Sequence, residues 1–102
     1  MVNPIEVVDR PPELEPRDKA PRKWVVVILN DDFTPMDYVT TLFVEVFHKS
    51  VEEAIVLTRQ VHHSGKAVAG VYTLEVAETK ISYVAALSRD NEYPLRAVIE
   101  PL

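Results

Sequence analysis

The distribution of hydrophobic residues predicts three short strands. The run Trp24–Leu29 is continuously apolar and rich in β-branched residues, which is typical of a buried strand. A second strand is expected over residues 67–73, with Gly70 inside it, and a third over residues 95–99, where apolar and other residues alternate.

Three helices are expected between these strands. The first should begin with Thr34 as N-cap and Pro35 at the first helical position, and it should run to about His48 with a wide apolar face. The second should begin at the capping box Ser50-Val51-Glu52-Glu53, and Gly65 should follow its last turn. The third is expected over residues 75–89, with a buried stripe made of Ala77, Ile81, Val84, Ala85 and Ser88. The order β-α-α-β-α-β favours an α+β fold in which a small sheet carries helices on one face.

Composition divides the chain near residue 22. Residues 1–22 contain five of the eight prolines, and proline fixes φ and removes a backbone donor. We interpret 1–22 as a flexible, extended N-terminal tail and 23–102 as one folded domain. Residues 1–10 carry acids and no apolar core, so they do not form a signal peptide, and a cytoplasmic protein is expected.

Charge and cysteine content exclude several classes of function. The 102 residues carry 16 acidic and 11 basic side chains, a net charge of −5, which argues against nucleic acid as the main partner. The chain has no cysteine, so it forms neither disulfides nor thiolate metal sites. Uncharged stretches are too short to span a bilayer, so no membrane association is expected.

Three polar features are candidates for chemistry. They are Asn30-Asp31-Asp32 after the first strand, His62-His63 near the end of the second helix, and Glu75-x-x-Glu78-x-Lys80 at the start of the third. Taken singly, each has an ordinary structural explanation: a turn that ends a strand, helix-end histidines that suit the dipole, and a solvated acidic first turn. His62 continues the line of the inward-facing residues of its helix and is expected to face inward.

Their order along the chain changes this interpretation. The segment after the first strand resembles the signature of the ClpS family, adaptors of the bacterial Clp protease: Asn30-Asp31-Asp32-Phe33-Thr34-Pro35-Met36-Asp37-Tyr38-Val39. Further matches follow in the same order: Val61-His62, Gly65-Lys66-Ala67, Gly70-Val71-Tyr72-Thr73, Glu75-Val76-Ala77-Glu78-Thr79-Lys80 and Asn91-Glu92-Tyr93-Pro94-Leu95. The resemblance covers essentially all of residues 23–102.

The resemblance implies an N-degron adaptor and not an enzyme. Family members bind proteins whose first residue is Leu, Phe, Tyr or Trp, and they deliver them to the AAA+ unfoldase ClpA, or ClpC in some bacteria, for degradation by ClpP. The implied fold is an antiparallel three-stranded sheet under three helices, similar to the C-terminal domain of a ribosomal stalk protein. No cofactor is implied, and a monomer is expected.

The resemblance also implies which residues form the site. Asn30, Asp32 and His62 would surround the α-amino group of the substrate, whose three N–H donors need three acceptors. The first side chain would enter an apolar pocket lined by Ile28, Thr34, Met36, Val39, Thr58, Val61 and Leu95. Phe33, Glu75 and Lys80 would contact the N-terminal domain of the unfoldase, and the tail would engage the unfoldase during delivery.

One pocket residue departs from the family pattern. Family members commonly have Met at the position of Thr58, whereas Met36 keeps the other methionine at the rim. Threonine is shorter and branched, so we expect more room near the rim and a changed preference among aromatic, Leu and β-branched first residues.

Two other functions stay open at the level of sequence. Asp31, Asp32, His62 and His63 could form a metal-hydrolase site, although their spacing is poor for one ion. The domain could also be an interaction module for another partner, such as the ribosome, because a fold does not determine function.

Overall fold

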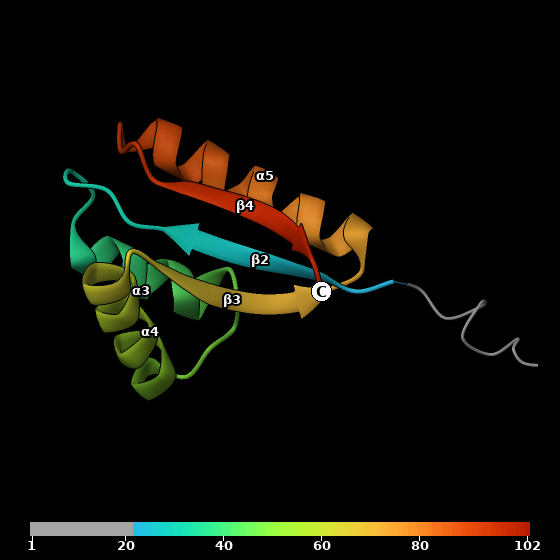
Figure 1. Ribbon diagram of the computed structural model, residues 1–102. Coiled ribbons are helices and arrows are strands. Elements are labelled where there is room, and N and C mark those ends of the chain that lie inside the picture. Colours follow the sequence, from blue (N-terminus) through green and yellow to red (C-terminus); the bar gives the residue numbers. More distant parts are fainter. Residues whose placement is uncertain (1–21) are drawn as a thin grey trace, which may run out of the picture.

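The computed structural model of the protein describes residues 22–102 and contains the six expected elements in the expected order (Figure 1). They are β2 (Trp24–Leu29), α3 (Met36–Glu45), α4 (Val51–Ser64), β3 (Lys66–Tyr72), α5 (Leu74–Asp90) and β4 (Arg96–Pro101). The α+β class and the order β-α-α-β-α-β are therefore confirmed. All of the predicted tail except Arg22 lies outside the described residues, so that interpretation stays a prediction.

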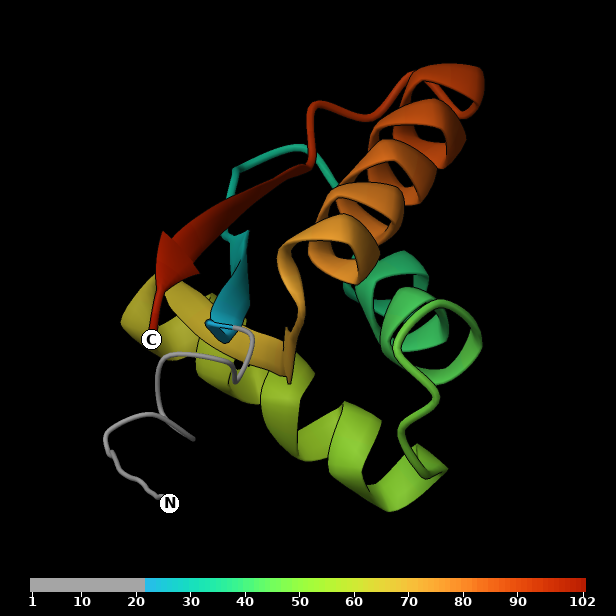
Figure 2. The same cartoon turned by 90° about the vertical axis from the view of Figure 1, so that its right-hand side faces the viewer.

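The three strands form one antiparallel sheet in the order β3-β2-β4, as expected. The most apolar strand, β2, is central: Ile28 pairs with Ala67 on one side and with Ala97 on the other. The register between β2 and β3 shifts between Val26 and Val27, where one strand carries an extra residue. Figure 2 shows the strands on one side of the molecule, with α3 and α5 on the other.

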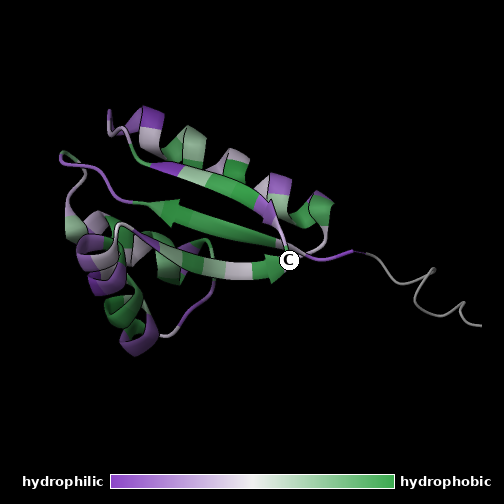
Figure 3. Cartoon of the chain, viewed as in Figure 1, coloured by the Kyte–Doolittle hydropathy of each residue, from purple (hydrophilic) through white to green (hydrophobic). Residues whose placement is uncertain are grey.

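The core lies between the sheet and the helices. Val26 and Ile28 of β2 point into it and contact a cluster that includes Phe43 of α3 and Val84 of α5, all of them fully buried. Because side chains alternate along a strand, Leu29 faces the opposite side of the sheet. Figure 3 shows β2 as mostly hydrophobic and the connection after it as hydrophilic, so the apolar run ends where the central strand ends.

The ends of α4 are those that the sequence predicts. The Ser50 side chain accepts from the backbone N–H of Glu53, and the Glu53 carboxylate accepts from the backbone N–H of Ser50, which completes the capping box. Gly65 closes the helix in the left-handed conformation with φ of 89°. A residue with a Cβ is strained at that angle, which explains why glycine stands there.

The expected start of α3 is wrong. Thr34 does not cap the helix, because its hydroxyl donates to the Asp31 carboxylate instead. The N-cap residue is Pro35, which has no side-chain bond to the helix, and α3 ends at Glu45, not near His48. His48 adopts a positive φ of 59°, which the helix cannot accommodate.

Smaller differences concern α5 and β4. Thr73 caps α5, which begins at Leu74, one residue earlier than expected. Ala85 was expected in the buried stripe, but it is exposed, because it lies about 100° around the helix from buried Val84. β4 begins at Arg96, so Leu95 lies in the connection before the strand. No helix among residues 22–102 has the length and hydropathy needed to cross a membrane.

Candidate functional site

The connection after β2 is held in place at several points. The backbone N–H of Asn30 donates to the carbonyl oxygen of Gly65 at 2.8 Å, which ties the end of β2 to the turn between α4 and β3. The Asp31 carboxylate accepts from the backbone N–H groups of Phe33 and Thr34 and from the Thr34 hydroxyl, each at 2.8 Å. One short carboxylate therefore organises the whole turn between β2 and α3.

The same contacts determine the ionisation of Asp31. Partial burial acts to raise the pKa of this carboxyl, but hydrogen bonds from the Phe33 amide and from the hydroxyl and amide of Thr34 lower it more. The net result is a pKa below the ordinary value, so Asp31 is a carboxylate at neutral pH.

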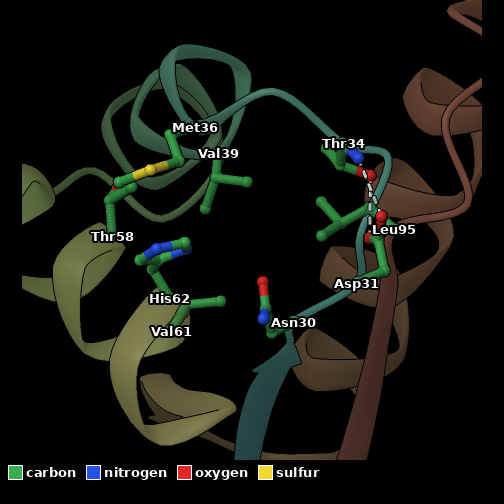
Figure 4. A pocket seen from close by; sticks show the side chains of 9 residues that line it. All are labelled: Asn30, Asp31, Thr34, Met36, Val39, Thr58, Val61, His62 and Leu95. Atoms are coloured by element: carbon green, nitrogen blue, oxygen red, sulfur yellow. Dashed lines mark hydrogen bonds between the residues drawn. The ribbon is translucent and has the colours of Figure 1, made fainter.

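A cavity of about 10 Å³ opens beside this turn (Figure 4). Asn30 and Asp31 line it from the connection after β2, His62 and Val61 from α4, and Leu95 from the segment before β4. Its complete lining consists of Asn30, Asp31, Thr34, Met36, Val39, Thr58, Val61, His62 and Leu95. The fold thus brings four separate parts of the chain together at one end of the sheet.

The cavity has apolar walls and a polar rim. Val39, Val61 and Leu95 are at most 5% exposed and form the walls. In Figure 4 the side chain of Asn30 points into the cavity from the end of β2, and the His62 ring lies beside it on α4. Hydrogen-bonding groups therefore lie at the edge of an apolar depression.

Met36 is the most exposed apolar side chain at the rim of the cavity. It is 45% exposed, and in Figure 4 its thioether points across the rim toward Thr58. A space of about 10 Å³ holds no more than a single water-sized molecule, so a larger occupant requires that lining side chains move. Methionine suits such a position because it is unbranched and has several rotatable bonds.

Thr58 is buried, and its hydroxyl is used between helices. It donates to the carbonyl oxygen of Ala54 at 2.7 Å and lies 2.8 Å from the Thr40 hydroxyl on α3. Because these partners satisfy the hydroxyl, Thr58 brings no unpaired polar group to the cavity.

Of the ten residues predicted for the amine site and the pocket, eight line this cavity and two do not. Ile28 is 1% exposed in the core and does not line it. Asp32 is exposed and lines an adjoining groove that also includes Asn30 and Arg96. Asp31 takes part in the site without having been predicted there; a threonine three residues after an aspartate was the available signal for its turn. His62 was expected to face inward; it lines the cavity, but the residue as a whole is exposed.

Of the three residues expected to contact an unfoldase, Phe33 lies apart from Glu75 and Lys80, which border the same depression on α5. Phe33 is 79% exposed just beyond the Leu29 end of β2. Glu75 follows β3, whose last residue Tyr72 pairs with Trp24 at the opposite end of β2. Six residues of strand separate these ends, about 17–20 Å.

Lys80 has contacts within the domain. Its ammonium donates to the carbonyl oxygen of Val46 at the end of α3, at 2.5 Å, and lies 5.7 Å from the centre of the Tyr72 ring. A cation there suits both the helix terminus and the aromatic face. Lys80 therefore links α5, α3 and β3.

Among residues 22–102, no group of three or more His, Asp or Glu side chains is placed to hold a metal ion. His62 and His63 are neighbours with ring centres 5.1 Å apart, but only His62 lines the cavity. Adjacent residues on a helix point about 100° apart, so His62 and His63 do not converge on one ion.

Comparison with known proteins finds relatives over most of the chain. The family described as "ATP-dependent Clp protease adaptor protein ClpS" matches residues 19–98. A ClpS adapter protein of Deinococcus radiodurans is 51% identical over 83 residues, which are 81% of this chain and 74% of that protein. A ClpS adapter protein of Acetivibrio thermocellus is 43% identical over 83 residues, which are 81% and 84% of the two chains.

A solved structure shares the fold. It is Agrobacterium tumefaciens ClpS2 bound to L-phenylalaninamide, with a TM-score of 0.78 and 32% identity over 81% of this chain and 100% of that one. The family match, the identities and the shared fold agree over the domain that carries the cavity. The chain belongs to the ClpS family of Clp protease adaptors.

Proposed function

We propose that this adaptor binds proteins through a free N-terminal amine and a large hydrophobic first residue, Leu, Phe, Tyr or Trp. The observation that carries the proposal is the pairing of an apolar cavity with a polar rim formed by Asn30 and His62. Such a site suits a ligand with a charged donor group next to an apolar side chain.

The amine would be bound by Asn30, Asp32 and His62. An α-ammonium has three N–H donors, and an amide oxygen, a carboxylate and a ring nitrogen are three acceptors. Asp32 is exposed in the groove that adjoins the cavity, so its carboxylate would approach the amine from that side. An internal peptide N–H offers one donor and no charge, and each buried group left unpaired costs about 1–3 kcal/mol.

The first side chain would displace Met36 and pack against Val39, Val61 and Leu95. Full burial of a Leu or Phe side chain is worth about 1.5–3 kcal/mol. The ligand named for the Agrobacterium relative, L-phenylalaninamide, has both a free amine and an apolar side chain. That chemistry supports the same mode of binding here.

Thr58 would widen the range of accepted first residues. Its hydroxyl is hydrogen-bonded to Ala54 and Thr40, so it adds no free polar group to the pocket wall. Its side chain is also shorter than the Met that the family commonly has at this position. Once Met36 has moved, the rim has space beside Thr58. We infer a relative gain for β-branched and bulky aromatic first residues.

The bound protein would then pass to ClpA or ClpC for degradation by ClpP, with this adaptor acting as a cytoplasmic monomer. Exposed Glu75 on the first turn of α5 is the residue we assign to the unfoldase contact, with Lys80 beside it on the same helix and Phe33 as a separate contact. Residues 1–18 would act in delivery and not in peptide binding.

A reconstituted degradation assay tests the proposal. A reporter that begins with Leu is incubated with ClpP and either ClpA or ClpC, with and without this protein; the matched control begins with Met. We expect the protein to accelerate loss of the Leu reporter only, and removal of residues 1–18 to abolish the acceleration while peptide binding persists. Equal degradation of both reporters would contradict the proposal.

A further inference from the structure

Two threonine hydroxyls join α3 to α4 next to the cavity. The Thr40 hydroxyl lies 2.8 Å from the Thr58 hydroxyl and 3.0 Å from the carbonyl oxygen of Met36, one turn earlier on α3. The Thr58 hydroxyl lies 2.7 Å from the carbonyl oxygen of Ala54, one turn earlier on α4. Met36 and Thr58 line the cavity, and Thr40 does not. Thr40 therefore contacts two lining residues without lining the cavity itself.

The number of protons decides which of these contacts are hydrogen bonds. Each hydroxyl has one proton to donate, so the two threonines can supply two of the three contacts. If both donated to the carbonyl oxygens of their own helices, the contact between the two hydroxyl oxygens would have no proton. Contacts of 2.7 and 2.8 Å match the usual length of an O–H···O bond, and 3.0 Å is at its upper limit. Thr40 therefore donates to Thr58, and Thr58 donates to Ala54.

The bond from Thr40 fixes the direction in which the Thr58 side chain points. A threonine in a helix divides between two χ1 rotamers, which place its hydroxyl and its methyl group differently. The bond from Thr40 comes from another helix and is made in only one of them. Because both groups are attached to the same carbon, holding the hydroxyl also holds the methyl group. Thr58 lines the cavity, so this part of the wall has one shape.

We propose, on the basis of the proposed function, that Thr40 is a positioning residue for the choice of the first residue of the substrate: it holds Thr58 in one rotamer and so gives the pocket wall one shape. A wall that adopts two shapes distinguishes less well between ligands of equal volume than a wall that is held in place. Leu and Ile contain the same atoms and differ only in where the side chain branches. The ratio of their affinities therefore reports the shape of the wall and not the apolar area buried.

The test measures the affinities of two peptides by fluorescence anisotropy. The peptides are identical except that one begins with a free Leu and the other with a free Ile. Four proteins are titrated: the wild type, Thr40→Val, Thr40→Ser and Thr41→Val. Thr40→Ser keeps the hydroxyl. Thr41→Val is the matched control, because Thr41 is exposed on the same helix and donates to the carbonyl oxygen of Asp37 at 3.0 Å.

We expect the wild type to prefer Leu, and Thr40→Val to lower this preference about 2- to 10-fold, the equivalent of one hydrogen bond. Thr40→Ser and Thr41→Val should keep the preference of the wild type. An unchanged preference in Thr40→Val, or an equal loss of affinity for both peptides, would show that Thr40 only packs α3 against α4. That result would overturn the inference and leave the proposed function intact, whereas failure of the wild type to bind either peptide would overturn both.

A double substitution tests whether Thr40 acts through Thr58. Thr58→Val removes the hydroxyl that accepts the bond, so in that background Thr40→Val should leave the ratio of the two affinities unchanged. A further change as large as that in the wild-type background would mean that Thr40 acts by another route and would contradict the proposal.

Discussion

The Asp31 carboxylate accepts two hydrogen bonds from Thr34, one from its backbone N–H and one from its hydroxyl, each at 2.8 Å. Thr34 is therefore used to close the turn and not to cap α3. This pair fixes the turn that joins Asn30, at the polar rim, to the start of α3 at Met36. Asp31 thus positions the proposed amine site without being one of its three acceptors.

Replacement of Asp31 tests this positioning role. Asp31→Ala removes all three acceptor contacts, and we expect a loss of about 1–3 kcal/mol in unfolding free energy together with weaker binding of a Leu peptide. Asp31→Asn keeps one oxygen for the backbone amides, so its unfolding free energy and its peptide affinity should fall less than those of Asp31→Ala. Urea unfolding and anisotropy measure the two effects. Full peptide affinity in the Ala variant would contradict the positioning role.

Stability should also depend on pH through Asp31. Its pKa is lower in the folded protein than in the unfolded chain, so its ionised form contributes stability above the unfolded value of about 3.9. That contribution is lost as the pH falls through the lower, folded pKa. The unfolding free energy of the wild type relative to Asp31→Asn should therefore be larger at neutral pH than at about pH 3. A difference that does not change with pH would contradict this assignment.

The two adjacent histidines provide a matched pair for the amine site. His62 lines the cavity and His63 does not. We expect His62→Ala to weaken binding of a free N-terminal Leu peptide about 5- to 150-fold, the equivalent of one unpaired buried group, and His63→Ala to leave it nearly unchanged. Equal losses in the two variants would show that the histidines act through α4 and not through the amine.

Much of the fold could be predicted from local sequence because several elements carry strong signals. The six apolar residues of β2 can be buried only in the centre of a sheet, and the capping box at Ser50 and the glycine at Gly65 mark both ends of α4. The prediction that Ala85 is buried was wrong, because a small apolar residue beside the buried stripe of a helix is tolerated on either face.

The details of the site depended on tertiary contacts that sequence does not contain. The choice of Thr34 between capping a helix and bonding Asp31 is a competition between two local partners, and residue type does not decide it. The position of Asp32 in the adjoining groove follows from the direction of the turn that Asp31 imposes. The internal bond of Lys80 to Val46 joins residues far apart along the chain. The Asp-x-x-Thr spacing signals the turn, but neither the position of Asp32 nor the bond of Lys80 has a sequence signal of its own.

Substitutions at Met36 and Thr58 test how the pocket selects its first residue. Thr58→Met should reduce binding of peptides that begin with Ile or Trp relative to Leu, because a longer side chain fills the space beside Met36. Met36→Ala should enlarge the space at the rim and raise the affinity for peptides that begin with Ile relative to Leu. The ranking is measured with peptides that differ only in the first residue. An identical ranking in wild type and Thr58→Met would remove Thr58 as a determinant of specificity.

Gly70 leaves space for the ring of Tyr72. A Cβ at Gly70 would collide with the phenol oxygen and the ring carbons beside it, and Tyr72 is held between the sheet and Lys80. We expect Gly70→Ala to lower the unfolding free energy by about 1–3 kcal/mol. In a Tyr72→Ala background the same substitution should cost much less, because the colliding atoms are gone. Equal costs in the two backgrounds would exclude the ring as the cause.

The central claim is that a free, charged N-terminal amine is recognised at Asn30, Asp32 and His62. The most direct measurement compares two labelled peptides by fluorescence anisotropy: one begins with a free Leu, and the other is identical but N-acetylated. Acetylation removes the charge and two donors and leaves the side chain unchanged. We predict tight binding of the free peptide only, weakening above about pH 8 as the amine loses its proton. Equal binding of both peptides would contradict recognition of the amine and would reduce the cavity to a hydrophobic groove.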